Sequence, residues 1–367
     1  MRWGLLLLLP ACVPEPEGKG PAPELDCATS GHICTVAGTG SRAWSDDGLP
    51  ATESHLFLPT DAAEGPDGEL WVVDYNNMRL RRIAPDGTLE TLAGTGVHAY
   101  GVDGVAAIET PLENPVSVEV APEGHAFLME QHGARVFRLE DGWLEVYAGD
   151  ADNPGYEGWE GDGGPARDAS MSQSVGMALA DDGTLYIGDT RNNAIRVVSP
   201  DGIMDTLSGA GEAALVDGEK DDACFFQPHH VAVGDGVLYV ADAGNHAVRS
   251  VDLVTGAVRT IAGTGIAGFS GDGALATAAQ LDTPQGVAVG PDGELYIADS
   301  ENHVIRVVTT DGVIATAVGQ PGVFGLEGDG RPADQALLQW PTNVTVTSDG
   351  RLWIADTMNS VIREVAR

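Results

Sequence analysis

Positive charge is scarce in this chain of 367 residues, which has 19 Lys and Arg against 55 Asp and Glu and a net charge of −36. Nucleic acids and anionic membrane surfaces are bound mainly through Lys and Arg, so neither is an expected partner. The apolar run at residues 3–9 is far shorter than the roughly 20 residues that a membrane-spanning helix needs. The motifs G-x-S-x-G, H-E-x-x-H and the P-loop are also absent.

The N-terminus has the features of an export signal. Arg2 precedes the apolar run, and Leu9-Pro10-Ala11-Cys12 follows it. This tetrapeptide resembles the cleavage box of bacterial lipoproteins, which implies a signal peptide over residues 1–12 and a lipid on Cys12. An ordinary cleaved signal and a misassigned start codon are the alternatives. The expected product is an exported lipoprotein of the cell envelope, in the outer membrane, periplasm or surface, whose only membrane contact is the lipid anchor.

Residues 13–31 are rich in Pro and Glu and are expected to form a solvated tether. The chain has only 4 Cys and no C-x-x-C spacing, so the cysteines are interpreted as structural. An exported compartment permits disulfides, and Cys27 and Cys34 are close enough in sequence to close a small loop. With that pairing Cys224 becomes a buried free thiol, although three cysteines allow three pairs.

Glycine is abundant, at 49 residues, which indicates many tight turns and short strands. One pattern recurs along the chain: Asp, two residues, Asn, two residues, an aliphatic residue and Arg. A degenerate second copy has Glu130 for Asp, Gly133 for Asn and Phe137 for Arg. The anchoring acids, 53 to 59 residues apart, are Asp74, Glu130, Asp189, Asp242, Asp299 and Asp356.

Each copy divides into four short strands. In the fifth copy they are expected at residues 286–289, 294–298, 304–308 and 313–318, with Asp-Gly turns of the kind that join hairpins. A four-stranded antiparallel sheet repeated radially is a β-propeller blade. The sixth copy lacks a fourth strand, which residues 33–37 can supply to close the ring. The sequence therefore predicts an all-β, six-bladed propeller over residues 32–367.

The recurring signature, with Gly-Thr-Gly at the end of the fourth strand, resembles the NHL repeat. The linker motifs Gly271-Asp272-Gly273 and Ala276-x-x-Ala279-x-Leu281-x-x-Pro284 are similar to its bacterial extracytoplasmic variety. The resemblance implies the propeller fold over almost the whole chain. For function it implies less, because NHL propellers serve as binding platforms, as sensor domains of receptors and occasionally as lyases.

Loop lengths indicate where a site would lie. The turns inside the hairpins are short, whereas linkers of about 20 residues gather on the opposite face, and long loops on a rigid scaffold favour function. Neighbouring residues of a strand point to opposite faces, so at most one of two adjacent histidines is expected to line the channel. The candidate ligand-binding residues at the channel mouth are Asp61, Tyr75, His132, Arg191, His229, His230, Gln285, Glu301 and Asn343.

No cofactor is assigned, but two metals are considered. His229 and His230 suggest a zinc site, and the Asp-Gly elements of the linkers, such as Asp272-Gly273, suggest calcium. The Asp and Asn of the signature are interpreted as structural. The G-x-G-x-x-G match at residues 263–268 is rejected as a dinucleotide site, because no helix is expected after it.

Three functions remain open at this point. The leading hypothesis is a monomeric, non-catalytic platform that binds a protein, peptide or glycan on the long-loop face. The alternative is a metal-dependent enzyme with its site in the central channel, because a peptide-amidating lyase, lactonases and virginiamycin lyases are related propellers. The third is a surface protein with a purely structural role.

Overall fold

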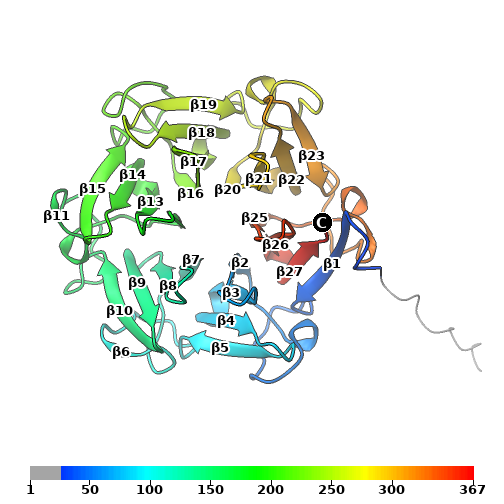
Figure 1. Cartoon of the computed structure of the whole chain (residues 1–367), viewed down its shortest axis with the longest axis horizontal. Coiled ribbons are helices and arrows are strands. Elements are labelled where there is room, and N and C mark those ends of the chain that lie inside the picture. The colour runs from blue at the N-terminus through cyan, green and yellow to red at the C-terminus, as the bar shows by residue number, and fades with distance from the viewer. Residues whose placement is uncertain (1–25) are drawn as a thin grey trace, which may run out of the picture.

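The computed structural model describes residues 26–367, which form a ring of six blades around a central channel (Figure 1). Each blade is an antiparallel sheet with four principal strands, so the predicted six-bladed β-propeller is confirmed. The predicted signal peptide, the lipidation of Cys12 and residues 13–25 of the expected tether lie outside the described residues. Within residues 26–367, no helix is both long and apolar enough to cross a membrane.

The strands of each blade run outward in order from the channel. The innermost strands are β2 (Pro59–Glu64), β7 (Pro115–Val120), β12 (Gly176–Leu179), β16 (Pro228–Gly234), β20 (Pro284–Val289) and β25 (Pro341–Val346). The second strands are β3 (Leu70–Asp74), β8 (Ala126–Glu130), β13 (Leu185–Asp189), β17 (Val237–Asp242), β21 (Leu295–Asp299) and β26 (Leu352–Asp356). The third strands are β4 (Arg79–Ile83), β9 (Arg135–Glu140), β14 (Ala194–Val198), β18 (Ala247–Asp252), β22 (Val304–Val308) and β27 (Val361–Val365). The outermost strands are β5 (Leu89–Ala93), β10 (Trp143–Ala148), β15 (Ile203–Ser208), β19 (Val258–Ala262), β23 (Ile314–Val318) and, in the sixth blade, β1 (His32–Ala37).

The N-terminal strand closes the ring, as the sequence predicts. β1 pairs antiparallel with β27, with Ile33 opposite Val365 and Ala37 opposite Ile362. Figure 1 shows β1 beside the last strand of the chain. Cys27 and Cys34 are joined by a disulfide, whereas Cys224 is free and buried. Residues 26–31 are exposed, but the Gly31 amide donates a hydrogen bond to the Ala366 carbonyl at 2.7 Å.

The hydrophobic core lies between neighbouring blades. Between the fourth and fifth blades, for example, Ala241 and Val248 pack in one cluster with Val287 and Ile297. Strand side chains alternate between the two faces of each sheet, so every blade contributes apolar residues to both of its neighbours. The hydrophobic core of the ring is therefore divided among six similar interfaces between neighbouring blades.

The first glycine of each Gly-Thr-Gly is required by the backbone. Gly263 has a φ of +91°, and a Cβ at this position would collide with the carbonyl oxygen of His246. Only glycine adopts this conformation without a steric penalty. It lets the chain leave the outer strand and begin the next linker.

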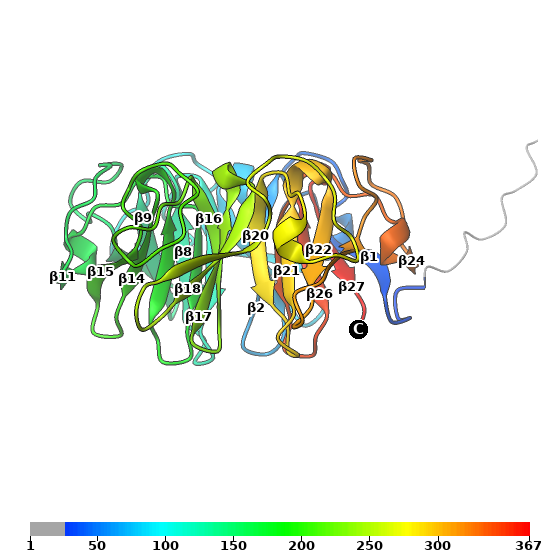
Figure 2. The ribbon, with the colours of Figure 1, turned by 90° about the horizontal axis from the view of Figure 1, so that it is seen from above.

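Each linker covers the outer edge of the following blade before it returns to the channel. Three linkers pair there as short fifth strands, β6 (Val105–Ala106), β11 (Gly164–Pro165) and β24 (Arg331–Pro332). Four contain a 3-10 turn, η1 (Ala51–Glu53), η3 (Ala166–Asp168), η6 (Ala276–Ala278) and η8 (Ala333–Gln335). The edge-on view shows the long loops on one side of the ring and the short turns on the other (Figure 2). The linkers are thus shared between the long-loop face and the rim, where they protect strand edges.

Candidate functional site

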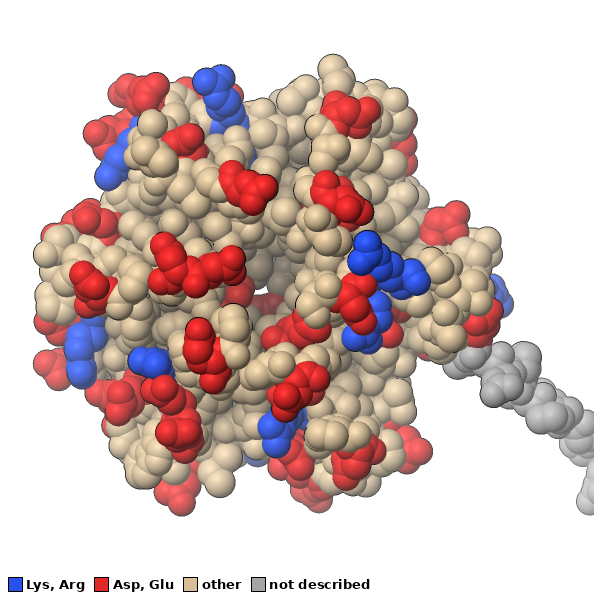
Figure 3. All heavy atoms as spheres, viewed as in Figure 1, with Lys and Arg blue, Asp and Glu red and all other residues tan. Residues whose placement is uncertain are grey.

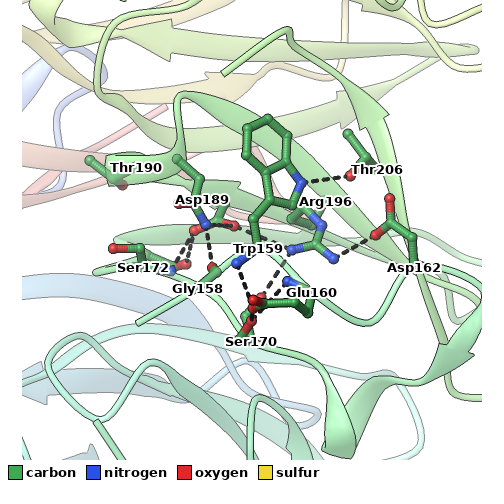
Figure 4. Close-up of polar contacts among 12 residues, drawn as sticks. Gly158, Trp159, Glu160, Asp162, Ser170, Ser172, Asp189, Thr190, Arg196 and Thr206 are labelled. Atoms are coloured by element: carbon green, nitrogen blue, oxygen red, sulfur yellow. Dashed lines mark hydrogen bonds and ion pairs between the residues drawn. The ribbon is translucent and has the colours of Figure 1, made fainter. Parts of the chain in front are cut away.

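A buried arginine stands at the centre of the repeated signature (Figure 4). In the third blade, Arg196 has a fully buried side chain and bridges two carboxylates. Its terminal nitrogens lie 3.4 Å from Asp189 Oδ2 and 2.6 Å from Asp162 Oδ1. Asp189 ends a strand, whereas Asp162 belongs to the Asp-Gly element of the linker. The arginine therefore fastens the linker to the blade.

The anchoring aspartate and its asparagine complete this attachment. Asp189 Oδ1 accepts a hydrogen bond from the Ser172 amide at 2.8 Å, and Oδ2 accepts one from Asn192 Nδ2 at 2.8 Å. Asn192 Nδ2 also donates to the Gly158 carbonyl at 2.7 Å. The bend is a 3-10 turn, η4 (Thr190–Asn192), and the equivalent turns are η2 (Tyr75–Asn77), η5 (Ala243–Asn245), η7 (Ser300–Asn302) and η9 (Thr357–Asn359).

The same attachment recurs wherever the signature is complete. The arginine–linker aspartate pairs are Arg81–Asp47 at 2.9 Å, Arg196–Asp162 at 2.6 Å, Arg249–Asp217 at 2.7 Å, Arg306–Asp272 at 2.6 Å and Arg363–Asp329 at 2.6 Å. These ion pairs correct the calcium hypothesis, because the carboxylates expected to bind the ion are neutralised by arginines. The structural interpretation of the signature Asp and Asn agrees with these contacts.

Burial raises the pKa of the anchoring aspartates despite their arginine and asparagine partners. The pKa is raised to about 6 for Asp299 and to about 7 for Asp356, in both cases chiefly because water is excluded. Such groups favour their neutral form more than an exposed carboxyl does. They lie beneath the linkers, away from the channel mouth, so we assign them no role in a binding site.

The degenerate second blade replaces this attachment with different residues. Glu130 takes the place of the anchoring Asp, and Arg135, from the start of the third strand, approaches it at 2.9 Å. The linker acid Asp103 has no signature arginine, because Phe137 occupies that position, and it pairs with the exposed Arg167 at 3.1 Å. The second blade therefore keeps an ion pair at its centre while its linker is held differently.

The channel mouth is formed by the starts of the inner strands. In five blades the register shifts just after the proline that begins the strand, as between Pro59 and Asp61. A β-bulge of this kind inserts a residue and breaks the alternation of side chains. Both His229 and His230 consequently line one cavity of about 200 Å³, which corrects the expectation that at most one of them would.

A polar cluster occupies the wall of this cavity. Asn343 Nδ2 donates a hydrogen bond to Asp61 Oδ1 and lies 3.3 Å from His230 Nε2. The other oxygen of Asp61 accepts a hydrogen bond from the Val118 amide at 2.9 Å. Because an amide nitrogen only donates, His230 Nε2 accepts, and the neutral ring carries its proton on Nδ1.

Both histidines are held in the neutral form. Burial and the neighbouring His230 lower the pKa of His229 to about 4. Burial likewise lowers the pKa of His230, although nearby Asp61 acts in the opposite direction. The Nδ1 atoms of both rings and Asn343 Oδ1 are buried and have no hydrogen-bond partner in the protein. Buried polar groups normally have partners. Nε of the signature arginines and Ser117 Oγ are unpaired as well, but the three atoms at the mouth belong to residues that line one cavity.

The channel below the mouth is acidic. Glu119 and Glu64 line the lower cavity together with Asp61. Desolvation and the charge of Asp61 raise the pKa of Glu119 well above its ordinary value. No Lys or Arg is among the residues that line either of these two cavities. The space-filling view shows a central hollow bordered by acidic side chains (Figure 3).

The structure brings six of the nine predicted residues together at the mouth and leaves three outside it. Asp61, Tyr75, His229, His230, Gln285 and Asn343 line the upper cavity. His132, Arg191 and Glu301 do not, which corrects their assignment. They follow the anchoring acid by two residues, whereas Tyr75 and Gln131 follow it directly and reach the cavity. One step in a 3-10 turn rotates a side chain by about a third of a turn, which accounts for the difference.

Some lining residues were missed by the sequence reasoning. Gln131, Thr60 and Thr342 line the mouth, and Glu119 lines the channel below it. Superposing the copies on their anchoring acids would have found Gln131, because it is the equivalent of Tyr75. Glu119 lies inside a strand, and no spacing in the sequence marks its side chain as facing the channel.

The metal-ligating side chains of the protein meet elsewhere. Among residues 26–367, the group of His, Cys, Asp and Glu side chains close enough to hold an ion is His98, Glu113 and His132. This group does not include His229 and His230; of the residues predicted from the sequence it contains His132. His98 and Glu113 were not among the sequence candidates.

Five blades with a buried acid–arginine attachment, and a sixth with a buried acid–arginine pair in its place, define an NHL-type β-propeller. A family model described as the Teneurin NHL domain matches residues 31–216 and 265–326. The chain belongs to this Teneurin NHL domain family. Teneurin-m of Drosophila melanogaster is 32% identical over an alignment of 344 positions, which covers 86% of this chain and 12% of that protein. Human Teneurin-1 is 28% identical over an alignment of 379 positions, which covers 91% of this chain and 13% of that protein.

This chain thus spans about an eighth of the length of these curated relatives. Solved structures share its fold at lower identity. A Bacteroides thetaiotaomicron protein described as being of unknown function has a TM-score of 0.68 and 17% identity, covering 91% of this chain and 75% of its own. An auxiliary nutrient binding protein from the same species has a TM-score of 0.64 and 15% identity, covering 90% and 75%.

Proposed function

We propose that this protein is an exported, lipid-anchored binding platform that receives a ligand at the mouth of its central channel, on the long-loop face. The observation that carries the proposal is the group of buried atoms without partners, His229 Nδ1, His230 Nδ1 and Asn343 Oδ1, on residues that line one cavity. A bound ligand or ordered water can supply the missing hydrogen bonds. The platform is expected to act as a monomer.

The chemistry of the mouth favours a ligand rich in hydroxyl or amino groups. The wall offers a donor at His230 and acceptors at Asn343 and Asp61, and no Lys or Arg among the lining residues balances the charge of Asp61. A glycan or a peptide with basic side chains fits this surface. The net charge of −36 also attracts a cationic peptide at low salt, an attraction that ions screen. A solved propeller described as an auxiliary nutrient binding protein is in keeping with such a role.

Arrays of glycans and of peptides, probed with the purified full chain, test the binding proposal. Tyr75→Ala and Gln285→Ala change residues that line the mouth, and Asp292→Ala, on a short hairpin turn of the opposite face, is the control. We expect at least one array member to be bound, with affinity about tenfold lower for the mouth variants and unchanged for the control. Binding that survives both mouth variants, or no binding to either array, contradicts the proposal.

Export and anchoring are tested separately. When the full chain is expressed in a bacterium supplied with labelled palmitate, the label is expected in the native protein and absent from Cys12→Ser. The unlabelled variant is also expected to leave the membrane fraction, because the lipid is the only proposed anchor. Cys224→Ser is the matched control, since that thiol is buried in the propeller. Equal labelling of native protein and Cys12→Ser contradicts the lipid anchor.

A further inference from the structure

Three potential metal ligands meet on the long-loop face of the second blade. His98 comes from the linker that enters the blade, Glu113 from the end of that linker and His132 from the bend after β8. Glu113 Oε1 lies 2.8 Å from His98 Nε2 and 3.3 Å from His132 Nδ1. One carboxylate oxygen is therefore shared by two imidazole nitrogens.

The backbone holds the three segments in place. His98 forms a parallel β-bridge with Leu112, directly before Glu113. The Glu113 amide donates a hydrogen bond to the buried carboxylate of Glu130 at 2.8 Å. Glu130 ends β8, two residues before His132. The position of each ligand is thus set by the blade rather than by the surface loops alone.

The contacts of His98 are unusual for a solvent-exposed histidine. Its Nε2 lies 2.8 Å from Glu113 Oε1 and also 2.7 Å from Asn114 Oδ1, and Asn114 is buried. A ring nitrogen carries at most one proton, so it cannot make a full hydrogen bond to both oxygens. A cation placed among these atoms would bind the nitrogen lone pair and the oxygens together.

We propose that His98, Glu113 and His132 form a binding site for a divalent transition metal, with zinc as the expected ion. Two imidazoles and one carboxylate are a common set of protein ligands for zinc, and they leave a fourth position open. A tetrahedral ion with bonds of about 2.0–2.1 Å separates its ligand atoms by about 3.3 Å. The two contacts of Glu113, at 2.8 and 3.3 Å, need only small movements to reach this spacing.

The other blades show that the fold does not require these side chains. The β-bridge that positions His98 recurs at Glu157, Ala213 and Phe324. The positions equivalent to Glu113 and His132 hold Phe226 and Gly244 in the fourth blade, and Gln339 and Met358 in the sixth. Blades without a carboxylate or a histidine at these positions have the same architecture. The second blade alone places two histidines and a carboxylate there, among the blades of the described chain.

The open fourth position faces solvent. The side chains of His98 and His132 are 54% and 45% exposed, so an ion is accessible from the long-loop face. The site is next to the channel mouth, because Gln131, which lines the cavity, directly precedes His132. The proposal does not rest on ligand binding at the mouth. Either site can fail its test without the other.

Calorimetric titration of the full chain with zinc chloride, after removal of metals by a chelator, tests the site. We expect about one zinc ion per chain. His98→Gln and His132→Gln are each expected to weaken binding by about tenfold or more, as the loss of a ligand requires. Cobalt added instead of zinc is expected to give a visible absorption spectrum that both variants lose.

Two variants serve as controls. His125→Gln removes a histidine of the same blade on the opposite face, and Arg191→Gln changes the position equivalent to His132 in the third blade. Both are expected to bind zinc as the native chain does. Unfolding temperatures within a few degrees of the native value show that the ligand variants are folded. Absence of stoichiometric zinc binding, or unchanged binding by His98→Gln and His132→Gln, overturns the proposal.

Discussion

The protein contains two kinds of buried polar group, and they differ in their partners. In the acid–arginine attachments, both oxygens of Asp189 and the amide of Asn192 have hydrogen bonds within the chain. At the channel mouth, His229, His230 and Asn343 keep atoms without partners. The attachments recur almost unchanged in five blades, whereas the residues of the mouth vary: the first mouth position holds Thr, Val, His or Gln in different blades.

The difference separates architecture from recognition. A polar group whose partners are supplied by the chain stabilises the fold, and its repetition reflects a repeated structural need. A buried polar group without a partner lowers stability and is retained when something outside the chain satisfies it. The attachments are not complete either, because Nε of each signature arginine is unpaired. None of these arginines lines the channel cavities.

Of the substitutions considered, the loss of an acid–arginine attachment is expected to lower the free energy of unfolding most. Arg196→Ala leaves the buried Asp189 and the linker acid Asp162 without their shared cation. Removal of one partner of a buried pair typically costs about 3–5 kcal/mol, so we expect a loss of this size in the free energy of unfolding. Urea denaturation followed by tryptophan fluorescence measures it.

The control for this experiment is Arg138→Ala. Arg138 pairs with Glu140 at 3.1 Å on an exposed surface, where an ion pair contributes less than about 1 kcal/mol. Equal destabilisation by Arg196→Ala and Arg138→Ala would show that the buried attachments do not hold the blades together.

The mouth is expected to make stability sensitive to acid. The folded protein keeps His229 neutral with a pKa of about 4, below the ordinary value of 6.5. Stability contributed by this neutral ring is present above pH 6.5 and is lost as the pH falls toward 4. Between pH 7 and pH 4.5 the loss amounts to about 2 kcal/mol, and His229→Asn is expected to lack it.

Urea denaturation of both proteins at the two pH values checks this difference. Gln285→Asn, which changes a lining residue that does not titrate, is expected to retain the native pH dependence. The anchoring aspartates, with raised pKa values, act in the opposite direction in every protein compared, so their contribution cancels. An identical loss in native protein and His229→Asn is the contradicting result.

The smallest expected difference in stability is between two buried serines, one with a hydrogen-bond partner and one without. Ser300 Oγ is buried and donates a hydrogen bond to the Pro341 carbonyl at 2.7 Å, whereas Ser117 Oγ is buried without a partner. Ser300→Ala is expected to cost about 1 kcal/mol and Ser117→Ala to be neutral or slightly stabilising. Thermal unfolding of the two variants and of the native chain measures the order of their stabilities. A larger loss of stability in Ser117→Ala than in Ser300→Ala would contradict the claim that buried hydroxyl groups stabilise the fold only when they have a hydrogen-bond partner.

Much of the fold could be predicted from the sequence, because it depends on local and repeated signals. The Asp-Gly turns and apolar runs gave the strands of the fifth blade to within about two residues at each end. The incomplete sixth copy indicated that residues 33–37 close the ring, as β1 does. A repeat tests each assignment several times within one chain, which makes such predictions reliable.

The site was harder to predict because it depends on departures from regular geometry. Strict alternation placed only one of His229 and His230 at the mouth, and a β-bulge brings both there. A shift of one residue within the bend after β8 separates Gln131, at the mouth, from His132, at the proposed metal site. The linker Asp-Gly elements suggested calcium because their arginine partners lie 32 to 34 residues away in sequence.

A high-resolution crystal structure of the full chain, with the solvent of the channel resolved, tests the central claim most directly. The account predicts ordered water or a bound ligand within about 2.7–3.2 Å of His229 Nδ1, His230 Nδ1 and Asn343 Oδ1. Side chains rotated so that these three atoms pair within the protein, around a cavity with no ordered molecule, would contradict the assignment of the mouth as a binding site.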